Sequence, residues 1–372
     1  MKDMKQFTFL TLESFKAIGG IQNVCKTLTY TLGNIAKYSA DISFFNLSLF
    51  DKDADNSYIH PSKFKGYSGN HIAFLKDAIL KGIVSHTVVI GHINLMAVAL
   101  IIKLFNNNVK IVMLAHGTEV WRKIPVWKKI FIRAYVEIWA VSSYTRDVLV
   151  ARHQINPEKV SVLQNCLDPF FKASKKFQKP AELLHIHSLA EDSPILLSVC
   201  RMSEHDWQKG YVKVLEMLPK LLKEFPKIHY FMVGHAGYEE RVRINTLIAK
   251  LKIKRHVTII GYVPDPDLTK YYQLCDVFVL PSEKEGFGLV FIEAASHGCS
   301  VISGDQDGSR EALLNGKLGY SVNTSNSDNL ERQTAICLRS KRTNISRLQI
   351  QNRCLTHFNQ RKYQAKVLEL LS

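Results

Sequence analysis

Residues 276–294 read DVFVLPSEKEGFGLVFIEA, and this stretch indicates both the fold and the functional site. Asp276–Leu280 is a short apolar run that ends at a proline, which is typical of a buried strand. Gly286 and Gly288 lie in the following loop, and a helix is expected to begin near Gly288. Glycines let backbone N–H groups approach a ligand closely, and a helix N-terminus favours a phosphate oxygen. The stretch therefore predicts a strand, an anion-binding loop and a helix in succession.

Two glutamates belong to this stretch. Glu285 lies in the loop, and Glu293 lies about one and a half turns into the helix. Paired carboxylates suit hydroxyl-rich ligands, because each oxygen accepts hydrogen bonds. Two solvated glutamates beside a capped helix are the alternative, and the residues alone leave both interpretations open.

The rest of the chain alternates apolar strand-like runs with helix-period segments, which is typical of parallel sheets with crossover helices. The first series of expected strands is 7–10, 42–49, 87–90, 109–114, 138–141 and 160–163. The pattern lapses over 168–193, where we predict a linker. The second series is 195–199, 228–233, 257–260, 276–280 and 300–303. The sequence thus predicts an α/β protein with two similar Rossmann-like, doubly wound domains, over 1–170 and 190–355.

Composition limits the class of protein. The chain has 372 residues, a formal net charge of +16 and seven singly scattered cysteines. Unpaired cysteines without metal-ligand spacing fit a reducing cytoplasm, and no apolar run is long enough to span a bilayer. Anionic ligands, nucleic acid or an anionic membrane surface would each account for the charge. No aromatic RNA-binding motif or basic recognition helix supports nucleic acid, so we expect no nucleic-acid partner.

Two further clusters follow strands, where open parallel sheets bind ligands. Arg201 and Lys209 follow the first strand of the second series, and His116 follows the strand 109–114. Two cations near a diphosphate leaving group would stabilise the negative charge that develops as it departs. A solvated basic loop and an ordinary polar loop histidine are the alternatives.

The spacing of Glu285 and Glu293 resembles the E-x7-E motif of family 4 retaining glycosyltransferases, which have the GT-B fold. Other segments resemble the same family in order and spacing: Gly19-Gly20-Ile21, His116-Gly117-Thr118-Glu119, Val141-Ser142-Ser143-Tyr144-Thr145, Gln164-Asn165-Cys166-Leu167-Asp168, Val199-Cys200-Arg201-Met202 with Lys209-Gly210, and Asp307-Gly308-Ser309-Arg310-Glu311. Four positions depart from the family pattern, because Gln164 replaces a proline and Cys166, Cys200 and Asp307 stand where glycine is common. The resemblance implies two domains that face each other across a cleft, with a last helix, 356–372, that packs back on the first domain.

The resemblance also implies roles for individual residues. The implied catalytic residues are His116, Arg201, Lys209 and Glu285, and the implied donor-binding residues are Gly20, Gly286, Phe287, Gly288, Leu289 and Glu293. Glu285 would bind sugar hydroxyls near the reacting carbon, and Glu293 would bind the ribose. Arg201 and Lys209 would hold the diphosphate, while His116 would contact the transferred sugar.

The function implied is transfer of a hexosyl unit from a nucleoside-diphosphate sugar to an acceptor hydroxyl, with retention of configuration. The acceptor would be a lipid-linked or polysaccharide-precursor glycan, in bacterial surface-polysaccharide assembly. No cofactor or metal is expected, because protein cations would replace the metal. The alternative is a metal site at an Asp-x-Asp triplet. Such triplets occur at 51–55, 265–267 and 305–307. We expect solvated carboxylates at the first two, and the third lies near the donor loop.

Residues 121–133 form a basic and aromatic segment, with five basic residues, two tryptophans and no acid. The basic side chains expected to meet anionic headgroups are Lys128, Lys129 and Arg133. The apolar side chains expected to enter the membrane interface are Trp127, Ile130 and Phe131. A solvated helix with its apolar face in the core is an equal alternative. The expected location is cytoplasmic, or peripheral on the inner leaflet of the plasma membrane.

Other functions remain alternatives. A nucleotide-sugar epimerase or hydrolase on the same fold would turn over the donor without an acceptor. A nucleic-acid-binding protein rests on the net charge alone. A dinucleotide oxidoreductase is disfavoured, because no G-x-G-x-x-G follows an early strand.

Overall fold

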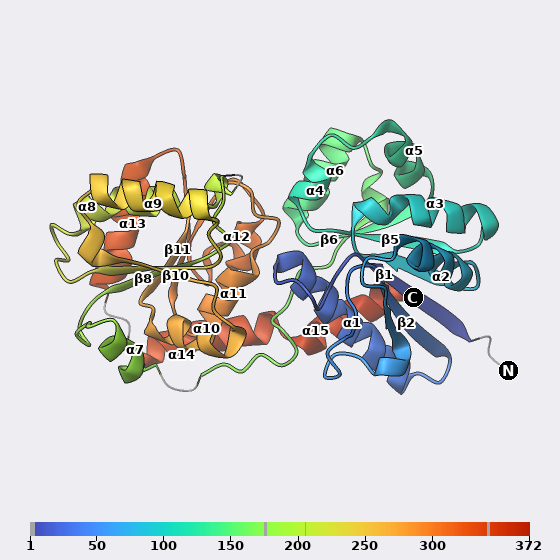
Figure 1. Cartoon of the computed structure of the whole chain (residues 1–372), viewed down its shortest axis with the longest axis horizontal. Coiled ribbons are helices and arrows are strands. Elements are labelled where there is room, and N and C mark those ends of the chain that lie inside the picture. Colours follow the sequence, from blue (N-terminus) through green and yellow to red (C-terminus); the bar gives the residue numbers. More distant parts are fainter. Residues whose placement is uncertain (1–3, 175–176, 205, 341–342) are drawn as a thin grey trace. The chain divides into compact units, whose positions relative to one another are not determined.

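The computed structural model describes residues 4–174, 177–204, 206–340 and 343–372. The chain divides into two compact units. Unit 1 comprises Met1–Phe170 and Asn359–Ser372, and unit 2 comprises Phe171–Phe358. Figure 1 shows each unit as a central sheet flanked by helices. The α/β class predicted from the alternating pattern is therefore confirmed.

Unit 1 contains, within the described residues, a seven-stranded parallel sheet in the order β3-β2-β1-β4-β5-β6-β7. Its strands are β1 Lys5–Thr11, β2 Ile42–Ser48, β3 Phe64–Gly66, β4 Thr87–Ile90, β5 Lys110–Ala115, β6 Val136–Ala140 and β7 Val160–Val162. Its helices are α1 Gly20–Tyr38, α2 His71–Ile83, α3 Met96–Phe105, α4 Thr118–Trp121, α5 Val126–Tyr135, α6 Ser143–His153 and α15 Gln360–Leu371. The central strand β4 is buried at every position, because helices cover both faces of a doubly wound sheet.

Unit 2 contains, in the part that the structure describes, a six-stranded parallel sheet in the order β10-β9-β8-β11-β12-β13. Its strands are β8 Ile195–Val199, β9 His229–Val233, β10 Val257–Gly261, β11 Val277–Leu280, β12 Ser300–Gly304 and β13 Tyr320–Val322. Its helices are α7 Ala181–Ile186, α8 Tyr211–Leu221, α9 Tyr238–Lys250, α10 Asp265–Leu274, α11 Leu289–Ser296, α12 Ser309–Ala312, α13 Ser327–Arg339 and α14 Asn344–His357.

The two sheets repeat one winding scheme, so the prediction of two similar folds in tandem is confirmed. In each sheet the first strand has the second on one side and the fourth on the other. The winding reverses between β1 and β4 in unit 1, and between β8 and β11 in unit 2. Ligands of open α/β sheets bind outside the carboxyl ends of the strands at this switch point.

The expected strands are all present, and the short elements that the sequence missed include the strands β3 and β13 and the helix α7. The edge strands β3 and β13 have only three residues each, too few to show a periodic pattern. The predicted linker contains the helix α7, whose six residues bury only Leu183. None of the helices in the described residues combines the length and the hydrophobicity that spanning a bilayer requires.

The C-terminal helix α15 packs within unit 1. Gln360 Nε2 donates to Thr31 Oγ1 of α1 at 2.6 Å, and Lys110 Nζ at the start of β5 donates to the Leu370 carbonyl at 3.4 Å. Tyr363, Val367 and Leu371 are its buried side chains. The chain therefore returns to unit 1 after completing unit 2.

Candidate functional site

Two loops meet at the switch point of unit 2, one after β8 and one after β11. Gly210 has φ +81°, and a Cβ there would lie 2.3 Å from the Pro281 carbonyl oxygen. The Glu283 N–H donates to the Gln208 carbonyl at 2.8 Å. Only glycine allows this approach, because its missing Cβ removes both the clash and the strain of a positive φ. The backbones of the two loops are thus in direct contact and joined by a hydrogen bond.

This packing brings Lys209 and Glu285 into an ion pair. The Lys209 Nζ lies 2.5 Å from Glu285 Oε2, and the two side chains are 26% and 18% exposed. Burial opposes the charge of the lysine, but the neighbouring Glu285 carboxylate outweighs it and raises the pKa of Lys209. Lys209 is therefore a cation at neutral pH, placed at the carboxyl end of the sheet.

Asp307 holds the backbone of Glu285. Its Oδ2 accepts from the Glu285 N–H at 2.6 Å, and its Oδ1 accepts from the N–H and hydroxyl of Ser309 at 3.0 and 2.6 Å. The Asp307 side chain is buried, and burial raises its pKa to about 6 against the effect of the Ser309 hydrogen bonds. At the position where the resembling family often has glycine, this chain has a carboxylate that fixes the loop after β11.

Glu293 has a different partner. It lies in the second turn of α11, and its Oε2 accepts from the hydroxyl of Tyr272 in α10 at 2.7 Å. Burial first, and Glu293 second, raise the pKa of Tyr272 well above its usual range, so the hydroxyl stays protonated. The two glutamates of the predicted pair are thus held by separate groups, a lysine and a tyrosine.

Arg201 pairs with Asp206 inside its own loop. Its Nε and one terminal nitrogen lie 2.7 and 3.2 Å from the two carboxylate oxygens. This hydrogen bonding raises the pKa of Arg201, and it lowers the pKa of Asp206 although burial alone would raise it. The Arg201 side chain is 73% exposed, so its charge remains accessible to an anion in solvent.

The remaining predicted donor-binding residues surround the start of α11. Gly286 and Gly288 are buried, and Gly288 has φ +88° directly before the first helical residue, Leu289. The side chain of Phe287 is buried against Phe358, with ring centroids 5.7 Å apart. Only the backbone of Phe287 can therefore serve a ligand.

In unit 1, His116 follows β5 at the carboxyl edge of the sheet. Its Nε2 lies 2.8 Å from the Gly91 carbonyl oxygen, so Nε2 is protonated in this contact, because a carbonyl only accepts. Its Nδ1 is buried and, within the described part of the chain, lacks a hydrogen-bond partner. Glu119 accepts from the His116 N–H at 2.6 Å and thereby fixes the backbone. The Nδ1 lone pair is suited to accept a hydrogen bond from a ligand hydroxyl.

Gly20 begins α1, after the loop that follows β1. A Cβ at Gly20 would meet nothing within 4 Å, so the fold itself does not require glycine there. The preceding loop is fixed by Asp51, whose carboxylate accepts from the N–H groups of Ser14, Phe15 and Lys16 at 2.7, 3.0 and 2.7 Å. Asp51 is fully buried, so the expectation of a solvated carboxylate at this position was wrong. Three backbone donors compensate the cost of burying its charge.

The Asp-x-Asp triplets do not form a metal centre in the part of the chain that is described. Asp51 and Asp307 accept backbone N–H groups, and no group of three or more His, Cys, Asp or Glu side chains is arranged to hold a metal ion there. The side chain of Asp265 lies outside the described part of the structure.

The basic and aromatic segment forms α5, and only part of the predicted surface is exposed. Trp127 and Ile130 are 44% and 62% exposed, whereas Phe131 is buried, so the expectation that Phe131 faces outward was wrong. Lys128 Nζ donates to the Ile93 carbonyl at 3.1 Å, and burial lowers the pKa of Lys128. Arg133 donates to the His153 carbonyl at 2.7 Å. These two cations thus hydrogen-bond to the rest of unit 1.

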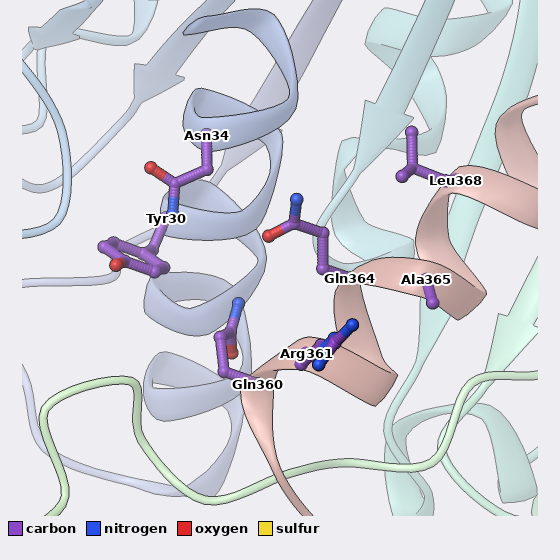
Figure 2. A pocket seen from close by; sticks show the side chains of 7 residues that line it. All are labelled: Tyr30, Asn34, Gln360, Arg361, Gln364, Ala365 and Leu368. Carbon is purple, nitrogen blue, oxygen red and sulfur yellow. The ribbon is translucent and has the colours of Figure 1, made fainter. Parts of the chain in front are cut away.

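A separate pocket of about 400 Å³ lies between α1 and α15 of unit 1. Figure 2 shows its lining side chains, which are Tyr30, Asn34, Gln360, Arg361, Gln364, Ala365 and Leu368. None of the predicted site residues lines it.

Sequence reasoning did not predict the supporting role of four residues. Asp206, Tyr272 and Asp307 hold the predicted residues Arg201, Glu293 and Glu285, and Asp51 holds the loop that precedes Gly20. Tyr272 and Asp51 carry no local signal, because they lie far along the chain from the residues that they hold. For Asp307 and Asp206, the only available signals were proximity to the predicted donor-binding loop and to Arg201.

Comparison with known proteins finds a family similarity within unit 2. Residues 181–352 match the family model described as glycosyl transferases group 1, and the expected enzyme class, a glycosyltransferase, is confirmed. A GDP-mannose-dependent alpha-(1-6)-phosphatidylinositol monomannoside mannosyltransferase of Mycolicibacterium smegmatis is 26% identical over 59% of this chain and 58% of its own length. A phosphatidyl-myo-inositol mannosyltransferase of Mycobacterium tuberculosis is 31% identical over 31% of this chain and 29% of its own. The chain thus matches less than two thirds of the length of either relative.

Solved structures share the fold over almost the whole chain. A glycosyltransferase from Rickettsia africae ESF-5 has a TM-score of 0.75 at 19% identity, covering 98% of this chain and 97% of its own. The Anabaena protein Alr3699/HepE in complex with UDP-glucose has a TM-score of 0.74 at 14% identity, covering 98% and 99%. These similarities confirm the predicted fold class.

Proposed function

We propose that the chain is a retaining glycosyltransferase that moves a hexosyl unit from a nucleoside-diphosphate sugar to an acceptor hydroxyl. The observation that carries the proposal is the Lys209–Glu285 pair at the switch point between β8 and β11, in a glycosyl transferases group 1 domain. A cation and a carboxylate side by side suit a ligand that joins a diphosphate to a hydroxylated ring. The names of the relatives, which include GDP-mannose-dependent enzymes, support a sugar-nucleotide donor.

In this mechanism, Lys209 stabilises the leaving diphosphate. As the bond to the sugar breaks, negative charge develops on the diphosphate. A positioned ammonium group therefore interacts more strongly with the diphosphate in the transition state than in the ground state. Arg201 supplies a second cation, which exchanges its contact with Asp206 for a phosphate oxygen. Glu285 accepts hydrogen bonds from the sugar hydroxyls near the reacting carbon.

Configuration is retained by front-face transfer within an oxocarbenium-like ion pair, with no covalent nucleophile. Glu293 binds the ribose, and backbone N–H groups at the start of α11 assist at the diphosphate. The protein cations take the place of a metal, and no cofactor takes part.

Unit 1 has candidate ligand-binding residues of its own. The His116 Nδ1 accepts a hydrogen bond from a hydroxyl of the transferred sugar, and the absence of a side chain at Gly20 lets a ligand approach the start of α1. The acceptor is a lipid-linked or polysaccharide-precursor glycan at the cytoplasmic face of a membrane, which would place the enzyme in surface-polysaccharide assembly.

A lipid-linked acceptor requires access to a membrane, and α5 offers an apolar surface for it. Trp127 and Ile130 are exposed there, and Leu104 and Phe105 at the end of α3 are each 75% exposed. Exposed aromatic and aliphatic side chains beside basic ones favour the interface of an anionic bilayer. The side chains of Lys128 and Arg133 hydrogen-bond within unit 1. Of the three predicted basic residues, Lys129 is the one for which no side-chain hydrogen bond is described.

A binding screen against UDP-, GDP- and ADP-hexoses tests the proposal, because a bound donor raises the melting temperature by mass action. Glu285→Ala should abolish both the stabilisation by the matching donor and the transfer to acceptor. Product analysis by NMR should show the anomeric configuration of the donor. Turnover without acceptor would instead identify an epimerase or hydrolase, and no response to any sugar nucleotide, with salt-sensitive binding to DNA or RNA, would refute the proposal.

A further inference from the structure

Tyr272 joins two helices of unit 2 through one hydrogen bond. Its hydroxyl, on α10, donates to Glu293 Oε2 on α11 at 2.7 Å. The tyrosine is 2% exposed, whereas Glu293 is only partly buried. A buried donor therefore holds a carboxylate that can still reach solvent.

The ring of Tyr272 is itself fixed on both sides. It stacks on His297, with centroids 5.4 Å apart and an angle of 18° between the planes. On another side it packs against Phe278, with centroids 6.0 Å apart. His297 in turn lies 2.9 Å, through Nδ1, from the Glu293 carbonyl oxygen. The packed ring thus fixes the position of the Tyr272 hydroxyl. His297 contacts both this ring and the backbone of Glu293.

This arrangement has a chemical consequence for Glu293. A hydrogen bond from a fixed donor sets the orientation of the carboxylate that accepts it. An oriented carboxylate is a good acceptor for a pair of vicinal hydroxyls, such as those of a ribose.

We propose that Tyr272 is a positioning residue of the nucleoside end of the donor site, which sets the Glu293 carboxylate for the ribose hydroxyls. The inference rests on the proposed function, in which Glu293 binds the ribose. Tyr272 is buried and its hydroxyl donates to Glu293, so its effect on the donor passes through Glu293.

The test is Tyr272→Phe, which removes one oxygen atom and keeps the stacked ring. Loss of one charge-assisted hydrogen bond should weaken binding of the matching UDP or GDP roughly tenfold, with kcat for transfer changed less than twofold. Tyr271→Phe is the matched control. Tyr271 is the preceding residue and its side chain is also largely buried. Within the described part of the chain, the Tyr271 hydroxyl makes no hydrogen bond.

Titration with the 2′-deoxy form of the same nucleoside diphosphate separates positioning from general loss of structure. In the wild type, removing the 2′-hydroxyl should weaken binding, and in Tyr272→Phe the additional loss should be clearly smaller. A tyrosine that only stabilises the fold would leave the ratio between the two ligands unchanged, and that result would overturn the inference.

Glu293→Gln distinguishes failure of the inference from failure of the proposed function. If Glu293→Gln binds both nucleotides like the wild type, the ribose-binding role of Glu293 is wrong. If Glu293→Gln loses the preference for the ribose form while Tyr272→Phe behaves like Tyr271→Phe, only the role of Tyr272 is wrong.

Discussion

Asp307 makes the stability of unit 2 depend on pH in a way that a single substitution can reveal. Burial raises the pKa of this carboxyl from 3.8 to about 6, so the folded state prefers the protonated form. At 1.36 kcal/mol for each pH unit, the shift corresponds to about 3 kcal/mol. This contribution is fully present below about pH 4 and is lost as pH rises through about 6. About 1.4 kcal/mol of it falls between pH 5 and 7.5.

Asp307→Asn removes the titration. Its free energy of unfolding relative to the wild type should therefore rise by about 1.4 kcal/mol from pH 5 to pH 7.5, because only the wild type loses stability through this group. Urea unfolding at both pH values, followed by hydrogen exchange of peptides from unit 2, measures the difference. Asp305→Asn is the control, since that carboxylate is only partly buried and accepts from its neighbour Gln306. Parallel pH dependence in the wild type and Asp307→Asn would refute the reasoning.

The remaining predictions concern the site and the surface. Gly20→Ala should leave the melting temperature unchanged, because the new Cβ meets nothing, yet raise the KM for donor or acceptor; unchanged kinetics would rule out close approach of a ligand. Lys209→Met should lower kcat by roughly 10² to 10³, the usual cost of removing one group that stabilises developing charge, and near-normal turnover would contradict its role beside Glu285. Replacing Trp127 and Ile130 by alanine should weaken sedimentation with phosphatidylglycerol vesicles without lowering the melting temperature, since both side chains are exposed; equal sedimentation would reject docking through α5.

The fold could be predicted because its signals are local. Buried parallel strands such as 195–199 and 277–280 are short continuous apolar runs, and the glycines at 286 and 288 mark the turn into a helix. The same local signals placed Glu285 and Lys209 in loops that follow strands. Their contact follows from topology, because β8 and β11 are neighbours in the sheet although 76 residues separate the two side chains.

Most of the supporting residues could not be predicted, because they act over a long sequence separation or through the backbone. Asp51 holds N–H groups more than 30 residues before it, and Tyr272 reaches 21 residues forward to Glu293. A carboxylate that accepts backbone N–H groups looks, in a sequence, like any polar loop residue. The same limitation explains the error at Phe131, because a regular amphipathic pattern does not say which apolar side chains face the core.

The different partners of the two glutamates give them different responses to a ligand. Lys209 is a point charge with three donors, so it can keep Glu285 and add a phosphate oxygen, and the ligand then changes the field that Glu285 experiences. Tyr272 has one donor, already given to Glu293, and lies buried away from solvent. The environment of Glu293 should therefore stay nearly constant while that of Glu285 changes as the diphosphate binds and leaves. In the proposed reaction this difference separates the two tasks, since the carboxylate near the reacting carbon is coupled to the leaving group and the carboxylate at the nucleoside end is a fixed anchor.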